Sequence, residues 1–390
     1  MRLIRGCLAL AAALMLTAAA GAAMGEEMQV FVEGGALERE EATRLVALLG
    51  EAFPEAEWTA VFEEDGGDLR TLVMEDRAPQ LAICSPLTAS PWAKEGMLLP
   101  LEGCVADLSR MQRQVVDACV WDETLVMAPL RADHRRMAVN RKLMEMRHFS
   151  YMMDSLDHPV WYPSEINQIL EEFSVAGMPA IEIWPDENGG SAAVEALVQS
   201  IYCGALLSED GKQCLADGGG VLAGLTWLRD MVAGGTIVYV KDRQTALERF
   251  MAGKTALFID WTDEEDRKLS GKLRSSGVEL EVMPYPSAAG YPVRSFDLVA
   301  VCAFRGTSGA QEDLMLEAIA FLCEDVKAQI VLGDRAIWQD DAIWLPCMTA
   351  TDRGMTLRKL FAEALDAVME GGKTPESALS SLAATMNAIP

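Results

Sequence analysis

Apolar residues in the first part of the chain alternate between short runs and helical spacing. The run from Met28 to Val32 ends at Glu33-Gly34-Gly35, which predicts a strand followed by a turn. Apolar residues three and four apart then predict a helix, at Ala42, Leu45, Val46, Leu49 and Phe53. Two more strands, over 58–62 and 80–84, enclose a short helix over 69–74, and the second stops at Ser85-Pro86. Strands that alternate with helices predict a parallel sheet covered by helices.

The pattern changes along the rest of the chain. Two short apolar pieces around Asp122-Glu123 predict a hairpin, and Met137 to Asn140 predicts a strand that enters a long helical region. Helices are predicted over 163–173, 192–202, 222–232 and 244–251. Strand character returns over 255–261, 280–283 and 298–304. The last part is helical, over 314–322, over 357–369, and from Thr374-Pro375-Glu376, where Thr can cap a helix and Pro can take its first position.

The length and the missing linker predict how these elements are grouped. A chain of 390 residues exceeds what one core usually holds, so two domains or lobes are expected. No internal repeat and no low-complexity linker separates them, which favours several short crossings over one tether. In open α/β sheets a ligand binds beyond the carboxyl ends of the strands. The ligand is therefore expected in the cleft where two sheets face one another.

The first 25 residues have the pattern of a secretory signal peptide. Arg2 and Arg5 precede an apolar run over 8–20 that is too short to span a membrane, and small residues follow it up to Gly25. Cys7 precedes the apolar run, so lipid attachment there is not expected. We expect a secreted protein, in the periplasm or at the extracellular face of the cell membrane.

Charge and motifs exclude several function classes. The formal net charge of −26 argues against nucleic acid or an anionic membrane as a partner, because both need clustered Lys and Arg. The chain has three histidines, and it lacks His-Glu-x-x-His, Gly-x-Ser-x-Gly and a phosphate loop. A hydrolase or metalloenzyme is therefore disfavoured, and neither a metal ion nor a cofactor is expected.

Eight cysteines follow the predicted leader, and their pairing is left open by the sequence. Export favours disulfides, and the shortest separations favour Cys203 with Cys214 and Cys104 with Cys119. Three further cysteines lie in apolar segments and are expected to be inert core thiols, at Cys84, Cys302 and Cys323. No Cys-x-x-Cys pair occurs, which argues against a zinc or redox site.

Weak motifs in a consistent order resemble one protein family. Phe250 to Trp261 (FMAGKTALFIDW) is the sharpest, a Phe-x-x-Gly-Lys-x-Ala run that enters a strand ending near Trp. The other motifs are Glu123 to Pro129 (ETLVMAP), Met137 to Met144 (MAVNRKLM), Met283 to Pro286, Ala318 to Val331 and Thr374 to Met386. Together they resemble the extracellular solute-binding proteins of ABC importers, in the branch that includes maltose-binding proteins.

The resemblance implies an α/β fold of two lobes, of the type II periplasmic-binding-protein kind, joined by three crossings. We place the crossings near 131–136, 252–255 and 293–296. This placement assigns 26–131 and 255–295 to lobe 1, and 132–254 and 296–390 to lobe 2. It also implies a monomer that closes on a sugar or sugar derivative and delivers it to a transmembrane ABC permease.

Candidate ligand residues lie where predicted strands end. A tryptophan can stack on a sugar ring, and Trp261, which is followed by Thr262-Asp263, ends a strand, while Trp184 precedes a loop with several acceptors. Trp338 is a further candidate of this kind. Among polar groups we expect contributions from Glu33, Ser85, Asp263 and Arg135.

Two alternatives remain open from the sequence. Arg135, with Arg131, His134 and Arg136, could hold an anionic ligand group, or it could pair with acids of the other lobe. Paired carboxylates such as those in 63–65 and 264–266 leave room for a secreted carbohydrate-active enzyme. A sensor or scaffold of the same fold, without a permease, is also compatible with the sequence.

Overall fold

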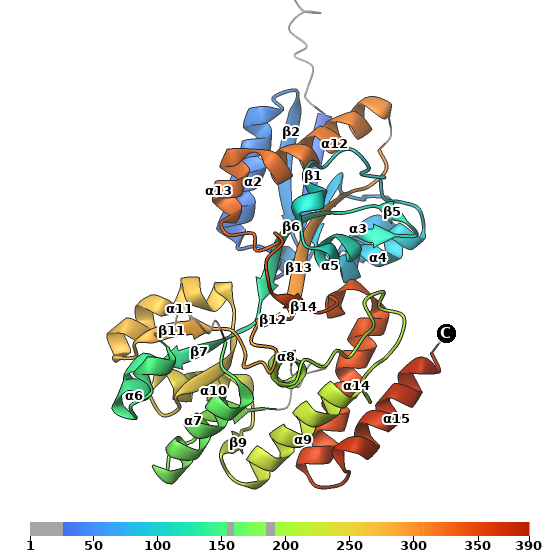
Figure 1. Ribbon diagram of the computed structural model, residues 1–390. Coiled ribbons are helices and arrows are strands. Elements are labelled where there is room, and N and C mark those ends of the chain that lie inside the picture. Colours follow the sequence, from blue (N-terminus) through green and yellow to red (C-terminus); the bar gives the residue numbers. More distant parts are fainter. Residues whose placement is uncertain (1–25, 154–159, 185–191, 307, 390) are drawn as a thin grey trace, which may run out of the picture.

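A computed structural model describes residues 26–153, 160–184, 192–306 and 308–389. Two lobes lie one above the other, each with a sheet at its centre and helices on its outside (Figure 1). The predicted leader, residues 1–25, lies outside the described residues. Within the described ranges, no helix is long and apolar enough to cross a membrane.

Lobe 1 is built around a five-stranded sheet in the described residues, with the strand order β2-β1-β3-β13-β6. Its strands are β1 (Glu26–Val32), β2 (Ala56–Phe62), β3 (Leu81–Cys84), β6 (Ala128–His134) and β13 (Phe296–Ala303). β1 pairs in parallel with β2 and β3, whereas β13 is antiparallel to both β3 and β6. The parallel part confirms the alternation of strand and helix seen in the sequence.

Helices cover this sheet because their apolar faces pack on it. They are α2 (Arg39–Ala52), α3 (Leu69–Met74), α4 (Pro86–Lys94), α5 (Arg113–Asp117), α12 (Gly309–Glu324) and α13 (Val326–Leu332). The predicted hairpin is formed by β4 (Val120–Trp121) and β5 (Thr124–Leu125). The helical face predicted from the spacing buries Ala42, Leu45, Val46 and Leu49 of α2 in the lobe 1 core.

Lobe 2 has its own five-stranded sheet in the described residues, with the order β11-β7-β10-β8-β9. The strands are β7 (Arg136–Asn140), β8 (Ile181–Ile183), β9 (Ile237–Tyr239), β10 (Leu257–Trp261) and β11 (Leu280–Met283). The helices are α6 (Arg141–Met146), α7 (Pro163–Val175), α8 (Ala192–Ile201), α9 (Gly219–Ala233), α10 (Arg243–Met251), α11 (Asp263–Ser276), α14 (Asp352–Met369) and α15 (Pro375–Asn387). The predicted cap of α15 is present, since the Thr374 side chain accepts a hydrogen bond from the Ser377 N–H.

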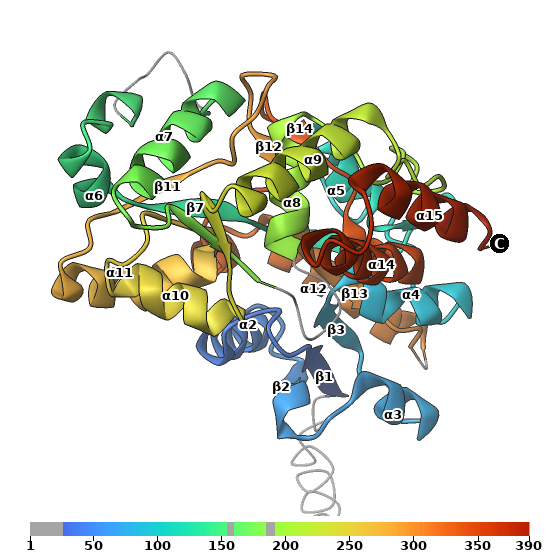
Figure 2. The ribbon, with the colours of Figure 1, turned by 90° about the horizontal axis from the view of Figure 1, so that it is seen from below.

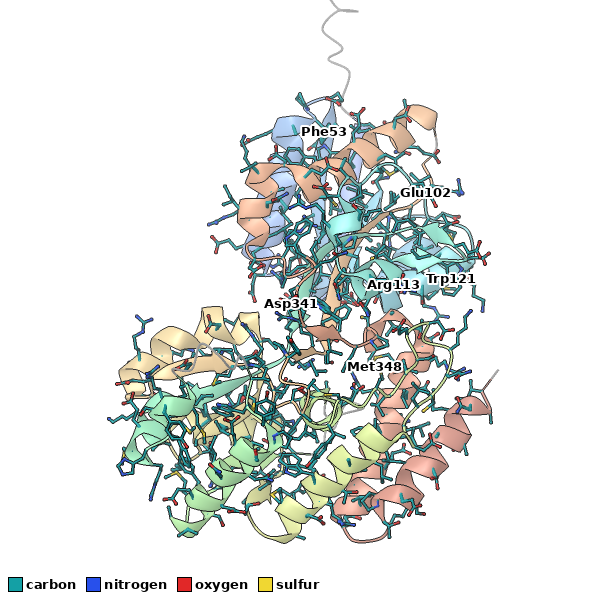
Figure 3. All side chains as sticks on the ribbon, viewed as in Figure 1. Phe53, Glu102, Arg113, Trp121, Asp341 and Met348 are labelled. Atoms are coloured by element: carbon teal, nitrogen blue, oxygen red, sulfur yellow. The ribbon has the colours of Figure 1, made fainter. Side chains whose placement is uncertain are left out.

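The chain passes between the two sheets at three places. Arg135 joins β6 to β7, and the segment 284–295 joins β11 to β13. After α13 the chain returns to lobe 2 between Cys347, which packs in the lobe 1 core, and Met348, which packs in the lobe 2 core and lies at the junction in Figure 3. A short parallel pair, β12 (Val293–Arg294) with β14 (Ile343–Trp344), links the second and third passages.

The domain boundaries expected from the sequence are wrong for three strands. β10 pairs with β7 and β8, and β11 pairs with β7, so both belong to lobe 2 rather than lobe 1. β13 lies inside the lobe 1 sheet, although 296–390 was assigned to lobe 2. The segment 252–255 is a turn within lobe 2 and not a crossing. An apolar run predicts that a strand is buried, but it does not identify the sheet in which the strand is buried.

The cysteines of the described residues form no disulfide. All eight cysteines in the described ranges are free, so the two favoured local pairs are not present. Three cysteines are buried in the lobe 1 core, which confirms that they are core thiols as predicted: Cys84, Cys302 and Cys323. Burial also raises the pKa of Cys323 to about 12, so that thiol stays protonated at neutral pH.

Candidate functional site

A cavity of about 660 Å³ lies between the two lobes. Its walls come from the ends of strands in both sheets, as expected for open α/β sheets. Glu33 follows β1, Ser85 follows β3, and Trp184 follows β8. β13 runs antiparallel to its neighbours, so its first residues, including Asp297, reach the same edge. The size is within the range of small-molecule sites.

The lobe 1 wall holds a carboxylate fixed by hydroxyl and amide groups. Ser85 donates its backbone N–H to Glu33 Oε2 at 2.5 Å and its hydroxyl to Glu33 Oε1 at 3.2 Å. The Thr88 hydroxyl also donates to Glu33 Oε1. Ser85 is at the same time the N-cap of α4, because its Oγ accepts from the Thr88 N–H. The carboxylate is thereby held at the end of β1 with its position fixed before any ligand arrives.

An ion-pair network forms the floor of the cavity at the hinge. Arg135 donates to Asp260 Oδ1 at 2.5 Å in lobe 2 and to Asp297 Oδ2 at 2.8 Å in lobe 1. Arg243 of α10 binds the other oxygen of Asp260 at 2.5 Å and Glu265 Oε1 at 2.6 Å. This geometry supports the alternative in which Arg135 pairs with acids, because its guanidinium donates hydrogen bonds to a carboxylate of each lobe.

Two buried groups extend the network into lobe 2. Arg358 of α14 lies 3.1 Å from Glu195 Oε2 in α8 and 3.7 Å from Asp297 Oδ1. Glu195 is fully buried, and burial raises its pKa, although the charge of Arg358 opposes this shift. One lobe 1 carboxylate, that of Asp297, is therefore held by both Arg135 and Arg358.

The network keeps the central carboxylates ionised. Burial alone would raise the pKa of Asp260, but the charges of Arg135 and Arg243 hold that pKa below its ordinary value. Burial lowers the pKa of Arg135, but the charges of Asp260 and Asp297 outweigh it and raise the pKa above the usual range. The floor of the cavity is therefore a fixed array of charges at neutral pH.

One aromatic ring lines the cavity among the described residues, that of Trp184. It stacks on Phe258 with ring centroids 5.6 Å apart and an interplanar angle of 15°, and it is 3% exposed. Arg243 in turn covers Phe258, with its guanidinium carbon 5.4 Å from the ring centroid. The acceptor loop expected after Trp184, residues 185–189, lies outside the described residues.

Three of the candidate residues expected at the site need correction or remain untested. Trp261 is fully buried and packs against Phe250 and Phe258, so the stacking role predicted for it is wrong. Trp338 lies on lobe 1 beside Arg110 and Arg335, outside the lining of the cavity. Asp263 begins α11, and its side chain is not among those described.

Several residues that line the cavity were not predicted from the sequence. Asp242 caps α10 by accepting the Thr245 N–H at 2.7 Å, and Arg243 and Gln244 follow it into the lining. Asp260 and Asp297 come from strand interiors. A polar residue within an apolar strand was the available signal, because a buried carboxylate needs a partner and so indicates a site or an ion pair.

An exposed ion pair joins a helix of lobe 2 to the start of a helix of lobe 1. Lys268 of α11 lies 2.7 Å from Glu38 Oε1 at the start of α2, and Figure 2 shows α11 on the side of lobe 2 near α2. Both side chains are substantially exposed, so the pair contributes little to stability, yet it marks where the lobes meet. The described His, Cys, Asp and Glu residues include no group of three that could hold a metal ion.

Comparisons with known proteins identify the fold. No protein-family model matches the chain, and no curated protein matches it by sequence. A cyclic α-maltosyl-1,6-maltose binding protein from Arthrobacter globiformis is similar in structure, with a TM-score of 0.76, 15% identity and coverage of 93% of this chain and 98% of that one.

Two further solved structures agree with the first. The sugar-binding protein MalE from Xanthomonas citri has a TM-score of 0.70 at 15% identity, and the match covers 93% of this chain and 96% of that one. An ABC substrate-binding protein from Listeria monocytogenes, solved with cycloalternan, has a TM-score of 0.68 at 13% identity over 93% and 98%. The two-lobed α/β fold of these binding proteins, expected from the sequence motifs, is confirmed.

Proposed function

We propose that this protein captures a carbohydrate in the interlobe cavity and delivers it to the transmembrane permease of an ABC transporter. The observation that carries the proposal is the cavity itself, which takes fixed polar groups from both lobes and one aromatic ring. Carbohydrates need this combination, because a ring face stacks on C–H groups while carboxylates accept from hydroxyls. The similar solved structures are binding proteins by name, and no catalytic motif occurs in the sequence.

The separate groups of the cavity have distinct roles in this proposal. Trp184 lines the cavity, and the stack of its ring on Phe258 holds it in place as a rigid apolar contact. Glu33 accepts from ligand hydroxyls on the lobe 1 side, with Ser85 as its support. Arg135 acts at the hinge, where it ties Asp260 to Asp297.

Export and delivery complete the proposal. The protein is secreted, acts as a monomer in the periplasm or at the cell surface, and passes its ligand to the permease after closure of the lobes. Co-purification of the tagged protein with solubilised permease, with and without saturating sugar, tests the delivery step. Size-exclusion chromatography with light scattering tests the monomer.

A thermal-shift screen over mono- and oligosaccharides tests the ligand class. A ligand that binds the native state stabilises it by mass action and so raises the melting temperature. At a ligand concentration about a hundred times Kd, the free energy of unfolding rises by about 2.7 kcal/mol. Calorimetry on each hit, followed by recovery of the sugar, separates capture from turnover. Recovery of unchanged sugar supports capture, whereas hydrolysed product, or no response to any carbohydrate, would overturn the proposal.

Trp184 provides a matched pair of variants for the same screen. Trp184→Ala removes the ring, and we expect affinity to fall about fivefold or more, because an aromatic contact contributes on the order of 1 kcal/mol. Trp184→Phe keeps a ring in the stack on Phe258 and should retain most of the affinity. Equal affinity of the two variants would contradict a contact between the Trp184 ring and the ligand.

A further inference from the structure

Carboxylates outnumber guanidinium groups around the cavity. Six acids line it, at Glu33, Asp133, Asp242, Asp260, Glu265 and Asp297, whereas the cationic side chains in the lining are Arg135 and Arg243. The ion-pair partners just behind the wall leave this excess unchanged. Arg131 pairs with Asp133 but also with Glu41, and Arg358 pairs with Asp297 but also with Glu195.

Both guanidinium groups that line the cavity are already engaged. Arg135 binds Asp260 and Asp297, and Arg243 binds Asp260 and Glu265, all within 2.8 Å. An acidic ligand would have to compete with Asp260, Asp297 and Glu265 for the N–H groups that these arginines already donate. Displacement would leave an uncompensated charge in a poorly solvated site, which is strongly unfavourable. The arginines therefore hold the floor together and are not a receptor for an anionic ligand.

Two carboxylates on opposite lobes lack an ion-pair partner within 4.0 Å among the described residues. Glu33 of lobe 1 is bound by the amide and hydroxyl groups of Ser85 and by the Thr88 hydroxyl. Asp242 of lobe 2 accepts the Thr245 N–H, and its neighbour Lys241 is not in the lining of the cavity. Both carboxylates thus line the cavity without a cationic side chain within 4.0 Å among the described residues.

No metal site accounts for the excess of acids among the described residues. No three of the described acids, histidines and cysteines could hold a metal ion together. The negative charge is spread over the walls, an arrangement suited to an extended organic cation.

We infer that the ligand is an aminated sugar, a carbohydrate with at least one protonated amine, and that Glu33 and Asp242 select it. The inference rests on the proposed carbohydrate function and makes it narrower. An ammonium group near either carboxylate gains Coulomb energy that a hydroxyl does not, and the same field disfavours a uronate or a sugar phosphate. Glu33 and Asp242 are specificity-determining residues in this account.

Calorimetry with matched sugars tests the inference. The probes are glucosamine and its β-1,4-linked di- and trisaccharides, their N-acetylated counterparts, the corresponding glucose sugars, and glucuronate, with α-linked glucose sugars as a second neutral series. We expect the amine form to bind about tenfold more tightly than the N-acetylated or hydroxyl form of the same sugar. Raising the salt concentration from about 0.05 to about 0.5 M should shrink this ratio, since salt screens the attraction. Glucuronate should not bind.

Charge-neutral variants identify the residues responsible. Glu33→Gln and Asp242→Asn should each lower the amine preference to about threefold or less, with a smaller effect on the neutral sugar. Asn caps helices as well as Asp does, so Asp242→Asn preserves α10. Glu57→Gln is the matched control, because Glu57 is exposed on β2 and outside the cavity lining, and its preference should equal that of the unmodified protein.

The outcomes separate this inference from the proposed function. A preference for the amine form that falls in both cavity variants but not in the control supports the inference. Neutral sugars that bind as tightly as amine sugars, or a preference untouched by Glu33→Gln and Asp242→Asn, overturns the inference and leaves the proposed function standing. Absence of binding by every sugar in every series overturns both.

Discussion

Adjacent residues of one strand face different surroundings because side chains alternate along it. In β10, Asp260 lines the cavity and takes part in the ion-pair network, whereas Trp261 is fully buried in the lobe 2 core. The same alternation applies in β13, where Phe296 packs in the core and Asp297 reaches the cavity. The role of each side chain is therefore set by one step along the strand.

Trp261→Ala should destabilise the protein by about 3–5 kcal/mol, because the change empties a large site in a packed core. Trp261→Phe should cost much less, since it keeps most of the volume and removes an indole N–H without a described hydrogen-bond partner. Denaturant unfolding measures both. Trp338→Ala is the control and should cost less than half as much, because Trp338 is 36% exposed. Near-normal stability of Trp261→Ala would contradict the core assignment.

His134 should make stability depend on pH between about 4 and 6.5. Burial lowers the pKa of His134 to about 4, and the charge of Arg294 lowers it further. Above pH 6.5 the ring is neutral in both states, so it has no effect. As pH falls toward 4 the unfolded state takes up the proton first, and up to about 3 kcal/mol of stability is lost.

A variant without the imidazole isolates this contribution. His134→Gln should lack that part of the pH dependence, because other groups titrate alike in both proteins. Unfolding free energies at several pH values between 4 and 7 measure the difference. His148→Gln, at an exposed position, should follow the unmodified protein. Parallel curves for His134→Gln and the unmodified protein would refute the shifted pKa.

At the scale of elements, most strands and helices follow from local sequence. The strand over 280–283 and the helix over 69–74 have the bounds predicted from apolar spacing. These succeed because a half-buried helix and a buried strand each impose a period on their own residues. The helix α11 was not predicted, because most of its residues are polar and apolar spacing is a weak signal there. Its start depends on a capping box formed by Thr262 and Glu265.

Close packing of α8 on α9 depends on Gly224. A Cβ built at Gly224 would lie 2.2 Å from the Val198 carbonyl oxygen, a contact that cannot form without moving the helices apart. Gly224→Ala should therefore destabilise the protein by about 1–3 kcal/mol, as overpacking does. Gly271→Ala in α11 is the matched change, because nothing lies within 4 Å of its added Cβ. That variant should gain up to about 1 kcal/mol from helix propensity. Thermal unfolding of both variants decides, and equal shifts would contradict the packing argument.

At the scale of the whole molecule, the sequence predicts the fold class but not the assembly of the lobes. Six motifs in a consistent order, with a ligand site expected at the ends of strands, were sufficient to predict the fold class. The assignment of β10 and β11 failed because the chain enters one sheet, leaves it and returns, and pairing between distant strands leaves no local signal. Prediction of the site from the sequence was limited for the same reason, since Asp242 and Glu33 are far apart in the chain and line one cavity only in the folded protein.

Three passages between the lobes predict hinge closure on ligand. Arg135, the segment 284–295 and the step from Cys347 to Met348 are short, so the lobes can rotate about them as rigid bodies. Small-angle scattering should give a smaller radius of gyration with a saturating sugar that raises the melting temperature. A sugar without that thermal effect is the control and should leave the scattering unchanged. Identical curves with a confirmed ligand would contradict closure.

Because β13 lies between β3 and β6, the lobe 1 sheet can be completed only late in translation. β6 ends at residue 134 and β13 begins at residue 296, with the lobe 2 strands between them. At roughly 5–20 residues per second, a ribosome needs on the order of ten to thirty seconds to make the intervening segment. Throughout that interval β3 and β6 lack the neighbour that joins them, and lobe 1 has an open sheet. The nascent chain thus remains a substrate for chaperones, and for threading through a narrow channel, until about three-quarters of it has been translated.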